Sequence, residues 1–264
     1  MPADLPVAMT IATSDSGAGA GVQADLLSFA ANGVFGVTCF AALTAQHPEG
    51  VSEVHPLPRD FLRAQYRQLE SFFEIAAIKV GMLFSAELIE ETARLLHSQT
   101  CPVVIDPVMV ASSGAPLLAD DAQQSLVEQL LPRATVITPN LDEAGVLLNC
   151  PLATASDIRS GARRLVEQFE TAVLIKGGHL EGEELFDFLL TPDGTQLELT
   201  AARREVDTHG SGCTLSAAIA ARLAQGEALT EAVSQAHAYL QHAFRAPLQV
   251  QGKTYLNHFP GSAL

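Results

Sequence analysis

A run of small and polar residues, His209–Cys213, stands directly before an apolar segment that is typical of a helix. It carries two glycines, Gly210 and Gly212, and a thiol, Cys213. The N-terminus of a helix offers unpaired backbone N–H groups and the positive end of the helix dipole, so this turn is suited to hold an anion. The run therefore joins a predicted phosphate site to a side chain that can react.

A second glycine-rich run, Ser14–Gly21, follows an apolar strand and precedes a segment that carries Asp25. Glycines let the backbone approach a ligand closely. The dinucleotide-binding pattern GxGxxG is incomplete, because its third glycine would fall at Val22. The run fits either a ligand-binding loop or a glycine-rich turn that caps a helix, and the polar residues on both sides favour the loop.

Charged and amide side chains follow several other predicted strands. Asp106 and Glu143 each come just after a buried strand, where a carboxylate either caps the next helix or organises Mg²⁺ through oxygen ligands and waters. Two such positions favour Mg²⁺. Lys176, which precedes two glycines, can offer a point charge to a phosphate, and Gln46 can hold the edge of a heterocycle. Taken singly, both also fit solvated residues before a turn.

Short β-branched runs alternate with amphipathic segments along the chain, which predicts an α/β fold with a mainly parallel sheet covered on both faces. The predicted strands are 7–12, 34–43, 76–80, 103–106, 135–138 and 172–176, with a hairpin over 185–190 and 196–199. The predicted helices are 20–31, 60–73, 86–98, 120–131, 141–148, 155–168, 211–225 and 230–243. Ligands bind at the carboxyl ends of parallel strands, so the polar runs should meet at one edge. We expect one domain over residues 1–264, with the tail from 247 its least regular part.

Composition limits the partners. The 264 residues are 48% hydrophobic, enough for a large core, and carry a net charge of −15, which argues against nucleic acid or an anionic membrane as the main partner. No apolar run reaches the ~18 residues that span a bilayer, and the N-terminus has no signal-peptide pattern. The four cysteines form no zinc pattern, and no Walker A sequence occurs. We therefore expect a cytoplasmic protein with reduced thiols.

Taken together, the motifs resemble those of the hydroxymethylpyrimidine/phosphomethylpyrimidine kinases of thiamine biosynthesis, within the ribokinase-like superfamily. The resemblance runs from about residue 8 to residue 243. It rests on TIATSDSGAGAGVQADL, ALTAQ, IKVGML, DPVM, TPNLDEA, KGGH and HGSGCTLSAAIAA, which occur in the family's order. It implies a three-layer fold with a central, mostly parallel sheet. It also implies transfer of the ATP γ-phosphoryl group to 4-amino-5-hydroxymethyl-2-methylpyrimidine, and again to its monophosphate, with Mg²⁺ and as a homodimer.

The same resemblance assigns roles to matching positions. The residues implied to contact the pyrimidine are Ala20, Asp25, Gln46, Met82 and Val108. Those implied near Mg²⁺ are Asp106 and Glu143, directly or through water. Those implied to bind ATP or phosphate are Asn140, Lys176, Thr208, Gly210 and Gly212. The implied catalytic set is Cys213 with the anion hole of Gly210, Ser211 and Gly212, and Lys176.

Two positions depart from the family pattern. Thr13 replaces a small glycine after the first strand, which affects the shape of the pocket, and Ser211 replaces a threonine but keeps its hydroxyl. Sugar kinases of the superfamily place an aspartate base where this chain has Cys213. A helix N-terminus lowers a thiol pKa, so a Cys213 thiolate is a reasonable base, although a bound phosphate would oppose that shift and leave a positioning role.

Three other functions remain open. The same fold also serves pyridoxal kinases, whose substrates carry a hydroxymethyl group on an aromatic ring. A thiol hydrolase would use Cys213 as nucleophile and His209 as base, but no third orienting residue is apparent and Lys176 would lack a role. A regulator that binds a pyrimidine without catalysis would need neither the anion hole nor Lys176.

Overall fold

The computed structural model describes residues 4–109, 120–178, 184–204 and 209–260, and it confirms the α/β class. Within these residues a nine-stranded sheet has the order β3-β2-β1-β4-β5-β6-β7-β8-β9. The strands from β2 to β7 are parallel, whereas β3, β8 and β9 pair antiparallel at the two edges. The sheet strands are β1 (Val7–Ser14), β2 (Phe35–His47), β3 (Gly50–Pro56), β4 (Ile75–Val80), β5 (Val103–Ile105), β6 (Val136–Ile137), β7 (Ala172–Ile175), β8 (Glu184–Leu190) and β9 (Gln196–Ala202).

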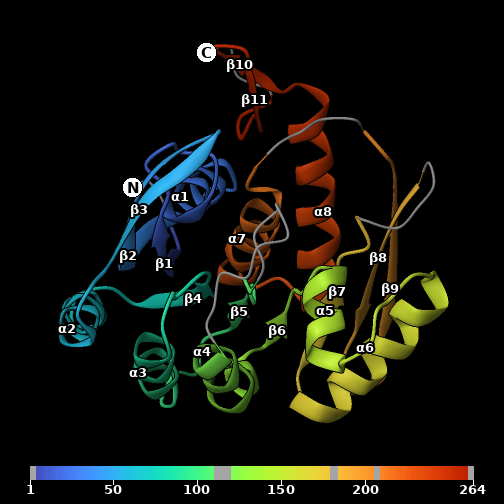
Figure 1. Ribbon diagram of the computed structural model, residues 1–264, viewed down its shortest axis with the longest axis horizontal. Coiled ribbons are helices and arrows are strands. Elements are labelled where there is room, and N and C mark those ends of the chain that lie inside the picture. The colour runs from blue at the N-terminus through green and yellow to red at the C-terminus, as the bar shows by residue number, and fades with distance from the viewer. Residues whose placement is uncertain (1–3, 110–119, 179–183, 205–208, 261–264) are drawn as a thin grey trace.

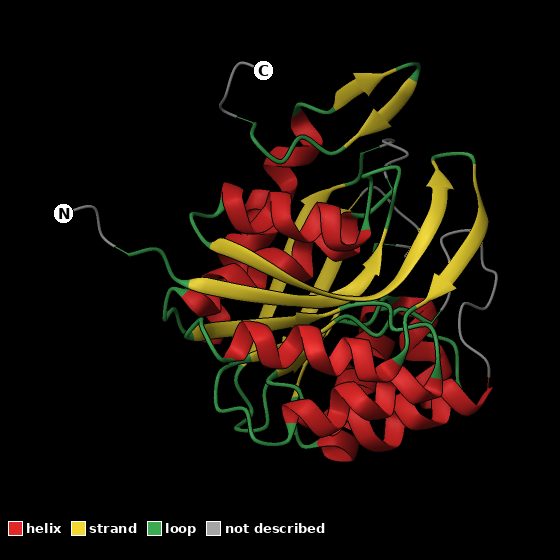
Figure 2. Cartoon of the chain, turned by 90° about the vertical axis from the view of Figure 1, so that its left-hand side faces the viewer, coloured by secondary structure: helices red, strands yellow, loops and turns green. Residues whose placement is uncertain are grey.

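Helices cover both faces of the sheet (Figures 1 and 2). Three of them pack on one face: α1 (Gly21–Ala31), α7 (Ser211–Ala224) and α8 (Leu229–Arg245). The other face carries α2 (Arg59–Glu70), α3 (Ala86–Leu96), α4 (Asp120–Ser125), α5 (Leu141–Leu148) and α6 (Ala155–Phe169). No helix in the described ranges is long and apolar enough to cross a membrane.

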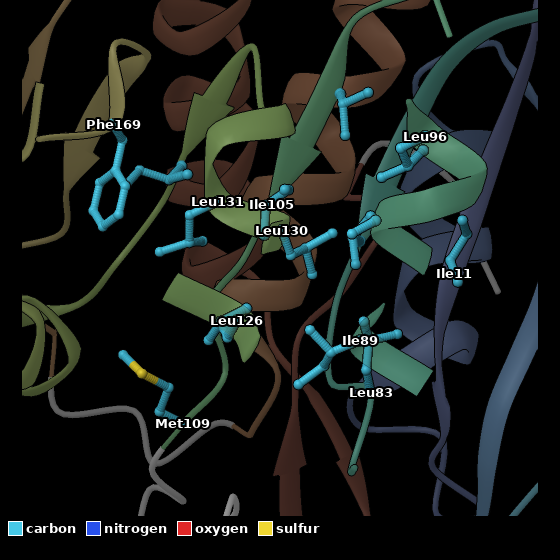
Figure 3. Close-up of a cluster of buried hydrophobic side chains, with 14 of the residues drawn as sticks. Ile11, Leu83, Ile89, Leu96, Ile105, Met109, Leu126, Leu130, Leu131 and Phe169 are labelled. Atoms are coloured by element: carbon cyan, nitrogen blue, oxygen red, sulfur yellow. The ribbon is translucent and has the colours of Figure 1, made fainter. Parts of the chain in front are cut away.

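Strand alternation builds two cores from the same strands, because successive side chains point to opposite faces. On β7, Val173 and Ile175 join the core under α2–α6, whereas Leu174 joins the core under α1, α7 and α8. Figure 3 shows part of the first core, where Ile105 and Leu130 lie in one apolar cluster. Burying both faces explains why the parallel strands are continuous apolar runs.

Helix α7 is built to lie close to the sheet. Residues 217–221, AAIAA, are fully buried, and four of the five are alanines whose small side chains let the helix approach the strands. The helix packs against β1, β4 and β5 of the sheet and against its neighbouring helices α1 and α8. Its N-terminus therefore stands at the carboxyl edge of the central strands, where the sequence predicted the polar runs to meet.

The structure differs from the sequence expectations in three segments. Strand β3 was not predicted, because an exposed edge strand with polar residues and a terminal Pro56 lacks an apolar signal. The tail forms a small hairpin, β10 (Leu248–Val250) and β11 (Lys253–Tyr255). The helix predicted over 120–131 is α4 followed by a π-helical turn over Leu126–Leu130 and a 3₁₀ turn over Leu131–Arg133.

Candidate active site

Two loops from opposite ends of the chain meet at the carboxyl edge of the sheet. Asp15 organises the first loop, because its carboxylate accepts hydrogen bonds from the backbone of Gly17, Gly19 and Ala20 at 2.8, 3.0 and 2.9 Å. Gly210, at the N-cap of α7, belongs to the second and has a φ of +90°. A Cβ at Gly210 would overlap the carbonyl oxygen of Gly19. We predicted that the glycines of these loops let the backbone approach a ligand. In the structure, the absence of a side chain at Gly210 lets the two loops contact each other.

The predicted phosphate end of the site holds an ion pair beside the α7 turn. Lys176 Nζ donates to Asp106 Oδ1 at 2.8 Å, and Thr138 Oγ1 donates to the same oxygen at 3.1 Å. A Cβ on Gly212 would lie 3.2 Å from Lys176 Nζ and 3.3 Å from Asp106 Oδ2. Burial lowers the pKa of Lys176, but Asp106 and Glu143 outweigh burial and raise it. A positive charge thus lies beside the free N–H groups of the helix.

Glu143 has the capping role that the sequence left open as an alternative to metal binding. Asn140 is the N-cap of α5, and it exchanges hydrogen bonds of 2.8 Å with Glu143 in both directions. Burial raises the pKa of Glu143 to about 7; Lys176 opposes this and Asp106 adds to it. The backbone of Asn140 also forms an isolated parallel β-bridge with the backbone of Lys176, which places the start of α5 at the same edge of the sheet as Lys176. One oxygen of Glu143 is used for the cap, and the carboxylate still lies in the field of Asp106.

The predicted end of the site for the phosphoryl acceptor holds a buried carboxylate. Asp25, on α1, is completely buried, and its Oδ2 accepts from Thr10 Oγ1 at 2.6 Å and from Lys79 Nζ at 2.9 Å. Its other oxygen, Oδ1, is buried and has no hydrogen-bond partner among the described residues. Such an atom is costly unless a ligand supplies a donor. This arrangement is what a binding site for an N–H or O–H donor requires.

Cys213 lies between these two ends, in the first turn of α7. The residue keeps part of its surface exposed, yet desolvation raises the thiol pKa to about 11, with Lys79 opposing and Asp25 and Asp106 reinforcing the shift. The sequence expectation of a lowered pKa is therefore wrong for this environment, because desolvation outweighs the nearby positive charge.

The other predicted acceptor contacts reach the same edge. Ala20 is the N-cap of α1, and Met82 and Val108 follow β4 and β5, each partly exposed. Thr13, one of the departures from the family pattern, donates through Oγ1 to the Met82 carbonyl at 2.9 Å. The hydroxyl thus fastens the segment that carries Met82. Ser211 is the first residue of α7, and Thr208 lies outside the described residues.

Gln46 and His209 contact each other at the mouth of the site. Gln46 Nε2 and His209 Nε2 are 3.1 Å apart, and His209 also lies 3.8 Å from Asp15 Oδ2. They line a small cavity of about 20 Å³, which Tyr255 of β11 also lines. No hydrogen bond joins His209 to Cys213 in the described part of the chain. The nucleophile–base pair that a thiol hydrolase needs is not formed.

A larger cavity, of about 240 Å³, lies between β9 and α8. His237 lines it and faces Asp187 Oδ2 at 3.9 Å, while Asp187 Oδ1 accepts from the backbone of Gly177 at 2.9 Å. Gly177 directly follows Lys176, so this cavity adjoins the phosphate end. Sequence reasoning missed Thr10, Lys79, Asp187 and His237. Only Lys79 left a signal, as a lone lysine inside an apolar strand.

The comparisons with known proteins identify the family. A family model described as phosphomethylpyrimidine kinase matches residues 15–257. The chain belongs to this family. A hydroxymethylpyrimidine/phosphomethylpyrimidine kinase of Haemophilus influenzae is 42% identical over 262 residues and is covered, like this chain, to 97%. The chain is accordingly a phosphotransferase, as the resemblance implied.

Solved structures of related kinases share the fold. An ADP complex of Bacillus subtilis pyridoxal kinase matches with a TM-score of 0.89 and 35% identity, over 97% of this chain and 98% of that one. The phosphomethylpyrimidine kinase of Clostridium difficile matches with a TM-score of 0.80 and 35% identity, over 90% of this chain and 98% of that one. The predicted three-layer ribokinase-like fold is confirmed.

Proposed function

We propose that this chain transfers the terminal phosphoryl group of ATP to the hydroxymethyl group of 4-amino-5-hydroxymethyl-2-methylpyrimidine, and then phosphorylates the monophosphate, in thiamine biosynthesis. The observation that carries the proposal is Asp25 Oδ1, a buried acceptor without a partner in the described residues. The amino group of the pyrimidine is a donor that satisfies it. Asp25 lies close enough to Cys213 and Asp106 for their charges to act on one another, so a ring held there has its hydroxymethyl group near the α7 turn.

Two features support ATP as the donor. The N–H groups at Gly210–Cys213 and the Lys176 ammonium can stabilise charge on a transferred phosphoryl group. The 240 Å³ cavity between β9 and α8 adjoins Lys176 through Gly177 and is the place for the nucleoside. Asn140, at the start of α5, is the amide at the same edge.

The carboxylates fit Mg²⁺ in the manner usual for kinases. Asp106 accepts from Lys176 and Glu143 accepts from the backbone of Asn140 and Met109, and no cluster of three potential metal ligands occurs in the described ranges. Mg²⁺ is commonly held by one or two carboxylates together with phosphates and waters, which this pair can supply. When bound, the ion would neutralise phosphate charge.

Cys213 is proposed as the group that takes the proton of the attacking hydroxyl. Only the thiolate can do so, and a pKa of about 11 makes it the minor form at neutral pH. A positioning role is the alternative, and it predicts a different pH dependence. The homodimer stays a prediction from the family resemblance, and the cytoplasmic location stays a prediction from the sequence composition.

Pyridoxal kinase is the second candidate, because the chain is 35% identical to the B. subtilis enzyme of that name. Release of ADP should be measured with Mg·ATP and, in turn, the pyrimidine alcohol, its monophosphate and pyridoxal. We expect the highest kcat/KM with the two pyrimidines. Turnover with pyridoxal alone would replace the proposal by the second candidate, and turnover with none of them would contradict both.

A further inference from the structure

Lys79 is a buried lysine that no part of the proposed reaction uses. It lies in β4 with no exposed surface, among the apolar residues of the strand. Its Nζ makes one hydrogen bond within the described residues, to Asp25 Oδ2 at 2.9 Å. A Cβ on Gly81 would lie 2.6 Å from that nitrogen, so the glycine leaves the space that the ammonium occupies. The position is shaped to hold a charge that reaches the acceptor site through its hydrogen bond to Asp25.

Stability alone is a weak reason for such a pair. Replacing a buried ion pair by apolar residues of similar volume is often neutral or stabilising, whereas removing one partner is costly. A strand between two apolar cores would accept a methionine at position 79 on volume alone. The pair therefore calls for a role in the site that it adjoins.

The geometry indicates the role. Lys79 and Thr10 both donate to Oδ2, so that oxygen is saturated and the carboxylate is held in one orientation. Oδ1 is then the oxygen left to accept from a ligand. We propose that Lys79 is a positioning residue of the acceptor site, which acts through Asp25 by fixing its orientation and keeping it ionised. The proposal rests on the proposed function, because it takes Asp25 as a contact of the acceptor.

The charged and titratable groups that face Asp25 support the proposal that Lys79 keeps this carboxylate ionised. They are Lys79 from β4, Cys213 from α7 and Asp106 from the end of β5. Burial raises the pKa of Asp25, Asp106 adds to the rise, and Lys79 opposes it. Without Lys79 the carboxyl would hold its proton to higher pH and no longer act as an anionic acceptor. Binding of an N–H donor should then weaken most at low pH.

The first test replaces Lys79 by methionine. We expect K79M to raise KM for the pyrimidine alcohol by about tenfold or more, since a charge-assisted hydrogen bond is weakened, while KM for ATP stays within about twofold. The loss should become smaller as the pH rises, because the Asp25 carboxyl then regains its charge. A residue that only fills the core would change stability without this split.

The decisive experiment is a double-mutant cycle with D25N, read as the dissociation constant of the pyrimidine alcohol by calorimetry without nucleotide. If Lys79 acts through Asp25, K79M should cost little further affinity in the D25N background. Thermal unfolding of the double variant should also recover relative to the single variants, because neither charge is left alone. Additive losses of affinity would overturn the proposal.

A second pair of variants covers the case in which K79M fails to fold. T10V removes the other donor to Oδ2, and T92V makes the same change at a buried threonine of α3 that donates to the Leu88 carbonyl. We expect T10V to weaken binding of the pyrimidine alcohol severalfold, and this loss of affinity should be coupled to that of D25N. T92V should affect stability only. Equal acceptor affinity in T10V, T92V and the unaltered chain would overturn the proposal. Absence of acceptor binding in the unaltered chain would instead contradict the proposed function.

Discussion

At the residue scale, the site depends on which atoms are left without partners. Their positions after predicted strands indicated Asp106, Lys176 and the α7 turn, and the family resemblance added Asp25. The structure brings them to one edge of the sheet. The sequence could not predict that Lys176 pairs with Asp106, because they lie 70 positions apart and their contact follows from strand order. The role of Lys79 was missed for a related reason, because the function of a lysine inside an apolar strand can be inferred only once its hydrogen-bond partner is known.

The first prediction concerns Gly210. G210A places a Cβ on the Gly19 carbonyl oxygen and strains a φ of +90°, so the two loops must separate. We expect kcat to fall by at least about a hundredfold, because the anion-binding N–H groups move. G226A is the matched control, since Gly226 has a φ of +84° with nothing within 4 Å of its added Cβ. It should lose about 1–2 kcal/mol of stability and keep its kcat. Equal kcat values for the two variants would contradict the account.

The second prediction concerns Cys213. A base must be deprotonated, so with a thiol pKa of about 11 the value of kcat should rise about tenfold for each pH unit between pH 7 and 9. C213A should lose both the rate and this slope. Unfolding curves recorded at each pH show whether the chain is folded. A flat profile in the unaltered chain would assign Cys213 to positioning instead.

At the element scale, helices position the functional side chains, and capping residues determine where each helix begins. The apolar periodicity predicted α5 and α6 with bounds that are confirmed within one residue, because each begins at a capping box. The same patterns missed β3, β10 and β11, whose residues are largely exposed and pair with a neighbour rather than with a core. Local sequence therefore predicts elements that pack one apolar face against the core. Exposed strands depend instead on the neighbouring strand with which they pair.

The third prediction concerns the contact of α2 with α3. Glu91 accepts from Arg63 and Arg94, and these bonds hold its pKa at about 2. The stabilisation is therefore present above about pH 4.5 and is lost as the pH falls towards 2. We expect E91Q to lower the free energy of unfolding by on the order of 1 kcal/mol at pH 7, with the difference shrinking below pH 4.5.

The control for that experiment is E87Q on the same helix. Glu87 pairs with Arg59, and both side chains are more than half exposed. Exposed pairs contribute little, so E87Q should change stability less than E91Q at neutral pH. Urea unfolding of both variants from pH 7 to pH 3 makes the comparison. A constant difference for E91Q over that range would show that its effect is not electrostatic.

At the scale of the whole molecule, the proposed function assigns the two substrates to different halves of the chain. The acceptor end comes from β1, α1 and β4, and the cavity assigned to the nucleoside comes from β9 and α8. Helix α7 joins them, since it packs against both α1 and α8. The sequence predicted the parallel sheet that creates this shared edge. It did not predict the cavity, which depends on how β9 and α8 face each other.

The fourth prediction follows from this division. Ala238 lines the 240 Å³ cavity, so A238F should fill it and raise KM for ATP by at least about tenfold while leaving acceptor affinity unchanged. Gln235, one turn earlier on α8, does not line the cavity, and Q235F is the control. Calorimetry with each ligand separately tests the prediction. If A238F weakened binding of the pyrimidine alcohol but not of ATP, the cavity between β9 and α8 would belong to the alcohol rather than to the nucleoside.

The most direct test of the central claim is the identity of the product. The purified chain should be incubated with Mg·ATP and 4-amino-5-hydroxymethyl-2-methylpyrimidine, and the mixture followed by ³¹P NMR and mass spectrometry. We expect a phosphate monoester on the hydroxymethyl group, followed by the diphosphate, with one ADP formed for each phosphoryl group transferred. Release of ADP and inorganic phosphate without a phosphorylated pyrimidine would contradict the proposed function.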